Sequence, residues 1–309
     1  MRNEQNMLEP SGVLLVNKHA GVTSHDIVGK IRRLYGTRRV GHTGTLDPMA
    51  TGVLVMLIGR AAKACEYLAS DVKRYRAGLK LGLTTDTEDT TGEILTRSDA
   101  IPSREDFYAV LPQFLGKIQQ IPPMYSALKV GGQKLCDLAR RGVTVERQAR
   151  DIEIFALDAT STDSPADYLL DVRCSGGTYI RTLCADIGAA LGCGAVMSSL
   201  ERVETSGFLL KNAHTVSQLE EMSMEERLDL LIPTEALFSA LSAVKLPSFY
   251  EKLCRSGCEI YLRKIGSPPL SVDERVRICT ENGEFFALGE VREYEKGLAI
   301  KAIKTFSLE

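Results

Sequence analysis

A glycine-rich segment carries the residue best suited to chemistry. Residues 41–52 read GHTGTLDPMATG and run into an apolar stretch. Pro48 disfavours the α region for Asp47 and keeps it extended, so a stiff backbone presents a carboxylate. Such a group can act as a nucleophile or stabilise a developing cation, and loops of this kind often carry function on a rigid scaffold. The alternative is a plain turn in which Asp47 caps a helix, because Asp before Pro is common there.

The totals describe a soluble globular protein. The 309 residues are 44% hydrophobic and 25% charged, long enough for one large or two ordinary domains. The start of the chain is polar, and the longest apolar run, residues 49–59, is too short to span a bilayer. We therefore expect a cytoplasmic protein without membrane contact. The eight cysteines lack paired Cys-x-x-Cys spacing, which predicts reduced thiols and no structural metal.

Charge is distributed unevenly along the chain. The net charge is −2, yet residues 18–76 hold eleven Lys and Arg against four Asp and Glu. Residues 216–237 hold six acids against Arg227 alone. A basic half can contact phosphates while an acidic segment faces away from them. Two ordinary solvated faces would give the same pattern.

Helical and strand periodicities alternate irregularly over residues 12–245. Helices are predicted at residues 24–35, 60–69, 103–111, 133–141, 178–191 and 216–231. Strands are predicted at residues 13–16, 53–58, 74–81, 143–158 and 168–174. Ser24 is the expected N-cap of the first helix, Gly36 its stop, and residues 84–92 a polar loop. Without a regular βαβ repeat, the pattern favours an α+β fold over a doubly wound sheet.

The pattern changes near residue 246. Short strands are expected at 276–279, 285–291 and 298–302, with hairpin turns at Asn282-Gly283 and Lys296-Gly297. We therefore divide the chain into a flexible N-terminus (1–11), a main domain (12–245) and a small β-rich domain (246–309).

Six segments in sequence order carry a family resemblance. Residues 41–52 are similar to the Gly-His-x-Gly-Thr-Leu-Asp-Pro-x-Ala-x-Gly signature of the bacterial tRNA pseudouridine synthase B (TruB) family. The other five are residues 16–24 (VNK and GVTS), 71–75 (DVKRY), 81–87 (LGLTTDT), 120–127 (QIPPMYSA) and 176–183 (GGTYIRTL). They fall across roughly residues 12–210.

The resemblance implies a fold and an activity. The fold would be the pseudouridine synthase fold, a mixed, mostly antiparallel sheet with the cleft across it, followed by a PUA-like domain that contacts RNA. The activity would be isomerisation of the T-loop uridine at tRNA position 55, in which the N1–C1′ bond breaks and the base rejoins through C5. No redox change or external group is involved, so no cofactor is expected.

The resemblance also assigns catalytic roles. Asp47 would be the essential carboxylate, with the step it performs left open. Arg181 would lie beside it and hold it ionised. Tyr75 would stack on the target base. From the residues alone, Arg181 could be a surface arginine, although a helix N-terminus disfavours a cation. Tyr75 could likewise be an ordinary residue of the hydrophobic core.

Further residues would contact the RNA. By resemblance, His42 would hold the extruded nucleotides open, Tyr179 and Leu200 would line the nucleotide pocket, and Lys18 would be a structural or phosphate-side group. Ordinary packing or an exposed strand end would explain the same residues. The candidates for backbone phosphates, each otherwise a solvated charge, are Arg38, Arg39, Lys63, Lys73 and Arg74. Extruding a base from a folded loop costs a few kcal/mol of stacking.

Three positions depart from the family pattern: His19 for proline, Cys136 for tyrosine, and Glu201 for a basic residue. They bear on RNA affinity more than on chemistry. The expected partner is the tRNA T-arm, without guide RNA or obligate protein partner, and the expected state is a monomer. Three alternatives are a non-catalytic tRNA-binding or folding factor, a guide-RNA-dependent relative, and a glycosidase-like hydrolase. Intact Asp47, Tyr75 and Arg181 disfavour the non-catalytic factor. The insertion at 86–149 disfavours the guide-RNA-dependent relative. The motifs supply only one carboxylate, which disfavours a glycosidase-like hydrolase, since that class usually needs two.

Overall fold

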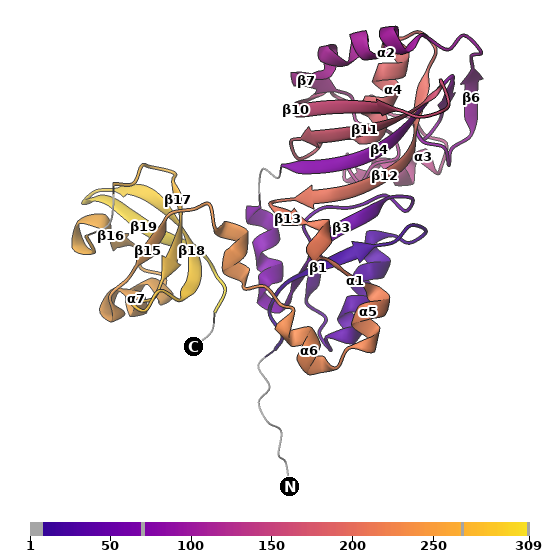
Figure 1. Cartoon of the computed structure of the whole chain (residues 1–309). Helices are drawn as coiled ribbons and strands as arrows, with labels where there is room; N and C mark the ends of the chain where they lie inside the picture. The colour runs from indigo at the N-terminus through magenta and orange to yellow at the C-terminus, as the bar shows by residue number, and fades with distance from the viewer. Residues whose placement is uncertain (1–8, 69–71, 267–268, 308–309) are drawn as a thin grey trace.

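The computed structural model describes residues 9–68, 72–266 and 269–307. Most of the predicted flexible N-terminus, residues 1–8, lies outside these ranges. Figure 1 shows two lobes stacked on each other and a third, C-terminal body beside the lower lobe. No helix in the described ranges is long and apolar enough to cross a membrane.

One ten-stranded sheet runs through both lobes. Its main path is β14-β1-β3-β12-β4-β11-β10-β7, with β2 paired to β3 and β13 paired to β12. The strands are β1 (Gly12–Lys18), β2 (Val40–His42), β3 (Thr51–Ile58), β4 (Lys73–Leu81), β7 (Gly116–Gln120), β10 (Arg150–Ser161), β11 (Asp167–Cys174), β12 (Ala195–Thr205), β13 (Phe208–Leu209) and β14 (His214–Thr215). Two of the described pairings, β1–β14 and β3–β12, are parallel and the others antiparallel. The predicted α+β fold with a mixed, mostly antiparallel sheet is confirmed.

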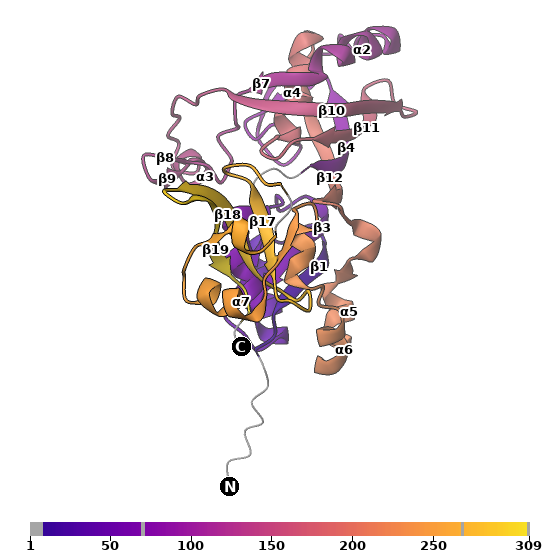
Figure 2. The same cartoon turned by 90° about the vertical axis from the view of Figure 1, so that its left-hand side faces the viewer.

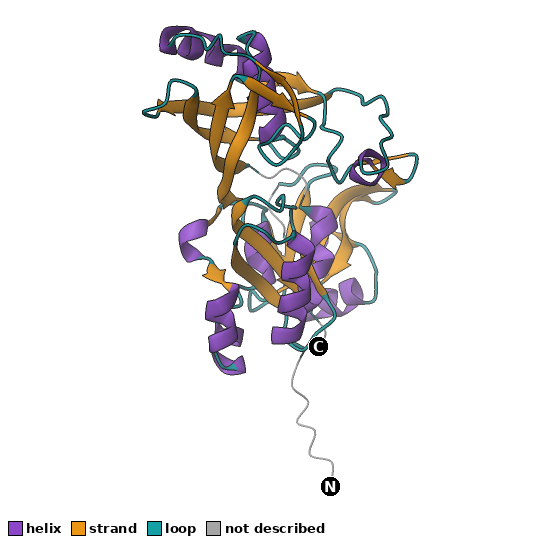
Figure 3. Cartoon of the chain, turned by 90° about the vertical axis from the view of Figure 1, so that its right-hand side faces the viewer, coloured by secondary structure: helices purple, strands orange, loops and turns teal. Residues whose placement is uncertain are grey.

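The strands form the centre of both lobes and helices pack outside them (Figure 3). In the upper lobe, α2 (Arg104–Val110) and the 3₁₀ turn η2 (Leu111–Phe114) cover one face. Phe107 of α2 stacks on Tyr168 of β11 with ring centroids 3.5 Å apart. Helix α4 (Ile180–Ala190) packs against β12, and Gly188 lets the two approach, because a Cβ there would lie 2.1 Å from the Ala195 nitrogen.

Helix α1 (Ser24–Leu34) packs its apolar face on the lower lobe. The prediction that Ser24 is its N-cap is wrong, because the N-cap is Thr23. Thr23 and Asp26 form a capping box, in which Asp26 binds the Thr23 backbone nitrogen at 2.8 Å. Ser24 is displaced from that role because its side chain is buried against Leu46. The helix ends before Gly36, whose φ of +63° suits the predicted stop.

Other predicted elements differ in type or extent. The helix expected at 60–69 is the 3₁₀ segment η1 (Gly59–Tyr67), and Ala69 lies outside the described residues. Residues 143–149 are irregular, so β10 begins only at Arg150. The acidic helix is two helices, α5 (Val216–Glu221) and α6 (Met224–Asp229), because Ser223 caps a new helix.

The polar segment 84–92 includes the end of β5 (Leu83–Thr85), which pairs with β6 (Ile94–Arg97). The helix expected at 133–141 shortens to α3 (Leu135–Ala139) after the β8 (Lys129–Val130) and β9 (Gln133–Lys134) hairpin.

The C-terminal body has its own five-stranded sheet, in the order β15-β17-β18-β19-β16. The three predicted strands are β17 (Arg275–Cys279), β18 (Phe285–Tyr294) and β19 (Gly297–Thr305). Both predicted hairpin turns are present, with φ of +93° at Gly283 and +104° at Gly297. The other elements are β15 (Ala243–Lys245), helix α7 (Ser248–Arg255), β16 (Ile260–Tyr261) and η5 (Leu262–Lys264).

The C-terminal body rests on η1, as the views in Figures 1 and 2 agree. Ala64 of η1 packs with Phe238, Leu288 and Phe306 in one apolar cluster, supported by the 3₁₀ segment η4 (Thr234–Phe238). Around it, Lys304 pairs with Glu66. The chain passes from the main sheet into η3 (Leu210–Asn212) and then α5 before reaching this contact.

Candidate active site

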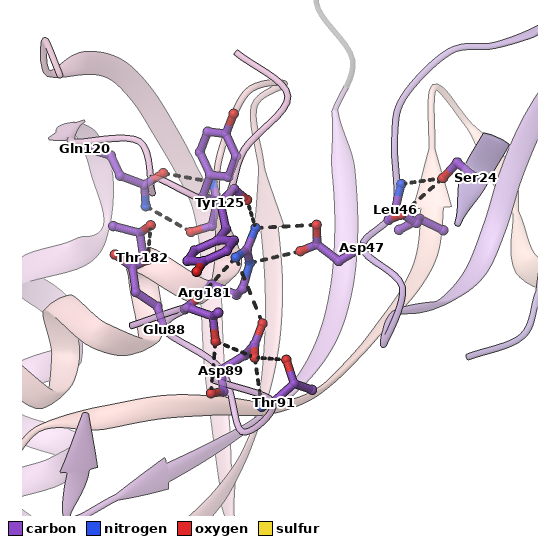
Figure 4. Close-up of polar contacts among 12 residues, drawn as sticks. Ser24, Leu46, Asp47, Glu88, Asp89, Thr91, Gln120, Tyr125, Arg181 and Thr182 are labelled. Atoms are coloured by element: carbon purple, nitrogen blue, oxygen red, sulfur yellow. Dashed lines mark hydrogen bonds and ion pairs between the residues drawn. The ribbon is translucent and has the colours of Figure 1, made fainter. Parts of the chain in front are cut away.

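Asp47 and Arg181 pair with each other between the loop before β3 and the start of α4 (Figure 4). The Arg181 Nε lies 2.9 Å from the Asp47 Oδ2, and its Nη2 donates to the Asp47 Oδ1 at 3.4 Å. Asp47 comes from the loop before β3 and Arg181 from the first turn of α4. The contact therefore joins residues 134 apart in sequence, as the resemblance predicts.

The remaining donors of Arg181 are also engaged. Its Nη1 donates to the Thr87 carbonyl at 3.0 Å, and its Nη2 donates to the Tyr125 carbonyl at 2.8 Å. The side chain is 5% exposed and that of Asp47 is 34% exposed. The guanidinium is therefore buried, with its donors directed at protein acceptors. The Asp47 carboxylate that it binds is partly exposed to solvent.

Local backbone contacts set the start of α4. Gln120 clamps Tyr179, the N-cap, by accepting from its nitrogen at 2.8 Å and donating to its carbonyl at 3.0 Å. Gly177, with φ of +88°, makes the preceding turn. Arg181 is the second helical residue, where the helix dipole disfavours a cation. Its acidic partners offset that cost.

A second carboxylate, which the sequence analysis missed, lies behind Arg181. The Asp89 Oδ2 is 4.0 Å from the Arg181 Nη1, and the Asp89 side chain is 7% exposed. Its other oxygen accepts from the Thr91 backbone and hydroxyl at 2.9 and 2.6 Å. The available signal was the Thr- and Asp-rich composition of residues 84–92, which we interpreted only as a polar loop.

Burial dominates the electrostatics of Asp47. Burial raises the pKa of the Asp47 carboxyl above its ordinary value, while the Arg181 guanidinium acts in the opposite direction and Asp89 adds to the increase. Arg181 thus favours the ionised acid, as predicted, but does not outweigh burial. Burial also raises the pKa of Glu88, whose carboxylate accepts from the Thr182 hydroxyl at 2.6 Å, and that of Asp186 to about 6.

Lys18 stabilises the Asp47 loop by binding its backbone carbonyls. Its side chain is fully buried, so the exposed strand end considered for it is wrong. The ammonium donates to the carbonyls of Ala50 at 2.6 Å, His19 at 3.0 Å and Pro48 at 3.3 Å. Burial lowers the pKa of Lys18 to about 8, although the Asp47 carboxylate opposes the shift. These contacts fit the structural role better than the phosphate-side role.

We expect Lys18→Met to change stability in a pH-dependent way. The lysine pKa is near 10.5 unfolded and about 8 folded, so between these values the unfolded chain binds more protons. The free energy of unfolding of the wild type relative to Lys18→Met should therefore rise from pH 8 to 10.5, by roughly 1–3 kcal/mol. Urea unfolding at both pH values measures this, with Lys80→Met, an exposed strand position, as the control. A constant difference would contradict the prediction.

Two further side chains fix the loop. The Ser24 hydroxyl donates to the Leu46 carbonyl at 3.1 Å and accepts from its nitrogen at 2.9 Å. Arg202 of β12, also missed by the sequence analysis, is 1% exposed and donates to the carbonyls of Val53 and Gly44 at 2.9 and 3.0 Å. No strand was predicted at β12, and the backbone carbonyls that Arg202 binds carry no sequence signal.

Tyr75 and Leu200 lie beside the same loop, on neighbouring strands β4 and β12. Tyr75 is 7% exposed, and burial raises the pKa of its hydroxyl while the Arg202 guanidinium lowers it. Leu200 is 8% exposed, and its carbonyl accepts from the Thr51 hydroxyl at 3.4 Å. Both are packed in the protein alone, so their predicted contacts with a base stay predictions.

His42 ends β2, at the entrance to the loop. Its ring is half-buried and its Nδ1 lacks a hydrogen-bond partner among the described residues. Burial lowers the pKa of the imidazole, so the neutral form is favoured near pH 7. Because the unpartnered Nδ1 is itself buried, the contact of His42 with a nucleotide stays a prediction.

The five backbone-phosphate candidates differ in surroundings. Arg38 is exposed and Lys73 is half-buried, close to Gly44. Arg39 pairs with Glu9 at 2.9 Å, Lys63 donates to the Thr305 carbonyl at 3.4 Å, and Arg74 forms a two-pronged pair with Asp171 at 2.7 and 2.9 Å. The Glu201 carboxylate lies 3.9 Å from Arg76 on β4. Within the described ranges, no group of three or more metal-ligating side chains comes together.

Two family models match consecutive parts of the chain. Residues 32–180 match the family model for the N-terminal domain of TruB family pseudouridylate synthases, and residues 181–239 match that for the tRNA pseudouridylate synthase B C-terminal domain. The chain is 42% identical to tRNA pseudouridine synthase B of Thiobacillus denitrificans, over 90% of this chain and 91% of that protein. It belongs to the TruB family. The Neisseria meningitidis protein of the same name is 39% identical over 98% and 97% of the two chains.

Solved structures carry the TruB-like fold as well. A crystal structure of a Cbf5-Nop10-Gar1 complex matches with a TM-score of 0.72 and 25% identity, covering 96% of this chain and 85% of that chain. An archaeal box H/ACA ribonucleoprotein complex gives a TM-score of 0.72 at 24% identity, covering 97% and 87%. The expected pseudouridine synthase fold is confirmed.

Proposed function

We propose that this TruB family member isomerises the T-loop uridine at tRNA position 55 to pseudouridine, with Asp47 as the essential carboxylate. The observation that carries the proposal is the Asp47–Arg181 pair at 2.9 Å, which joins a loop within the matched N-terminal family model to the first residue of the matched C-terminal model. Relatives 37–48% identical to the chain are named tRNA pseudouridine synthase B. The structures of ribonucleoprotein relatives are more distant, at 24–25% identity.

The geometry suits glycosidic-bond isomerisation. Cleavage of the N1–C1′ bond leaves positive character at C1′, which a carboxylate stabilises or captures. The base then turns and rejoins through C5, whose proton leaves. Arg181 orients the acid, and Tyr75 is proposed to stack on the base. Burial raises the pKa of the Asp47 carboxyl, and the Arg181 guanidinium opposes that rise and so favours the ionised form that this chemistry needs.

We also propose that the chain acts as a cytoplasmic monomer without guide RNA, and that residues 246–309 form a PUA-like domain that contacts the substrate. The support for contact is the seating of its sheet on η1, which adjoins β2 and His42. Light scattering of the full chain tests the monomer.

One assay tests the reaction and its position. An unmodified tRNA transcript tritiated at uridine C5 is incubated with the full chain, and tritium in water is counted. We expect one equivalent released per tRNA, and none from a transcript with cytidine at position 55. Ultraviolet crosslinking of the same transcript should recover peptides from both the main domain and residues 246–309. Tight binding without release would favour the non-catalytic binding factor instead.

A further inference from the structure

The two halves of the main sheet meet at a narrow seam. Strands β3 and β12 are joined by two residue pairs, Thr51 with Glu201 and Gly52 with Arg202. The Asp47 loop enters the sheet through β3, in the lower half. Arg181 and Tyr75 belong to α4 and β4, in the upper half (Figure 1). The relative position of these three side chains therefore depends on how the seam is held.

Arg202 spans that seam. It belongs to β12, yet its guanidinium donates to three carbonyls of the other half: Val53 at 2.9 Å, Gly44 at 3.0 Å and Thr45 at 3.5 Å. Two of these carbonyls lie in the Asp47 loop itself. Gly52 allows the close approach, because a Cβ there would lie 2.3 Å from the Arg202 carbonyl oxygen, and its φ is +108°.

The contrast with Lys18 separates two roles. Lys18 lies on β1, in the same half as the loop, and its contacts with Pro48 and Ala50 shape the loop internally. Arg202 instead links the loop to the half that holds Arg181. A rigid planar fork suits this link, since the Nε, Nη1 and Nη2 of Arg202 each donate to a different carbonyl in a fixed geometry.

We propose that Arg202 is a positioning residue that sets where the Asp47 carboxylate meets Arg181 and Tyr75 across the seam. The inference rests on the proposed function. Arg202 donates to backbone carbonyls of the lower half, and its guanidinium also lowers the pKa of the neighbouring Tyr75 hydroxyl, so it acts through the Asp47 loop and through Tyr75. Misplacement of a reacting group by 1 Å can cost about 10²-fold in rate.

Arg202→Lys tests the proposal because it keeps the charge and removes the fork. We expect the single-turnover rate of tritium release to fall roughly 10- to 100-fold. Affinity for the tRNA transcript should change by less than about 3-fold, because the loss lies in the reaction step and not in binding. The acid limb of the pH–rate profile should move to higher pH, because a displaced Asp47 loses the influence by which Arg181 lowers its pKa.

Thr51→Val is the matched control. It removes the bond from the Thr51 hydroxyl to the Leu200 carbonyl across the same seam, without touching the carbonyls that Arg202 binds. We expect this variant to lower the melting temperature only, with an unchanged rate and pH profile. A merely structural Arg202 would give the same result as this control.

The outcomes separate the two proposals. A wild type that binds the transcript but releases no tritium overturns the proposed function. An active wild type, with Arg202→Lys showing an unshifted acid limb, overturns the positioning role. If Arg202→Lys does not fold, Arg202→Gln replaces it, because a glutamine keeps a planar donor but cannot reach all three carbonyls. The slower rate and shifted limb are then expected of that variant, and their absence overturns the proposal.

Discussion

Asp47→Asn should abolish tritium release from C5-labelled tRNA, lowering the single-turnover rate by at least about 10³-fold. Asparagine has nearly the same shape and keeps an oxygen that can accept from Arg181, which lies 2.9 Å from the present carboxylate. What it removes is the negative charge that stabilises or captures C1′. Affinity for the transcript should stay nearly unchanged, because the proposed RNA contacts are made by other residues. Filter binding and tritium release on the same samples make the comparison.

The pH dependence gives a second test of Asp47. Because burial raises the pKa of this carboxyl, the wild-type rate should fall on acidification with a midpoint above the ordinary value of 3.8. The residual rate of Asp47→Asn should lack this limb. Asp106→Asn, an exposed carboxylate bonded to Ser103 on α2, is the control and should match wild type. An Asp47→Asn enzyme with wild-type rate would refute the assignment.

The fold was predictable where one face of an element is buried. Strand β11 alternates buried and exposed side chains from Tyr168 to Cys174, and helix α1 buries Ile27, Val28 and Ile31 along one stripe. Such period-2 and period-3.6 patterns follow from burial itself. Helix α7 was missed because its eight residues span only about two turns, too short for a helical period to stand out from the sequence around it.

The site was predictable only in part. Asp47 and Arg181 lie 134 residues apart, so no local pattern relates them, and the resemblance supplied their pairing. Asp89 and Arg202 were missed for a physical reason. Arg202 binds backbone carbonyls, which every residue has, and Asp89 binds hydroxyls and an amide in its own loop. Buried polar residues of this kind are recognised from what surrounds them in space.

Arg181→Met should destabilise the protein and inactivate it together. The guanidinium satisfies the Asp47 carboxylate and the carbonyls of Thr87 and Tyr125, and it lies 4.0 Å from Asp89. A methionine fills much of the volume but leaves the carboxylate and the carbonyls without their hydrogen-bond donor. Removing one partner of a buried ion pair costs about 3–5 kcal/mol, and we expect about 2–4 here because Asp47 is 34% exposed. The tritium-release rate should fall at least about 10²-fold.

The destabilisation should depend on pH with a defined sign. Without Arg181 the pKa of Asp47 rises further above 3.8, so the folded variant binds a proton that the unfolded chain gives up. Its stability deficit relative to wild type should therefore be smaller at pH 5 than at pH 7.5, because protonation neutralises the stranded acid. Urea unfolding of both proteins at both pH values measures this, with Arg173→Met, an exposed arginine of β11, as control. An equal deficit at the two pH values would show that Arg181 stabilises the fold by packing and carbonyl contacts rather than by its charge on Asp47.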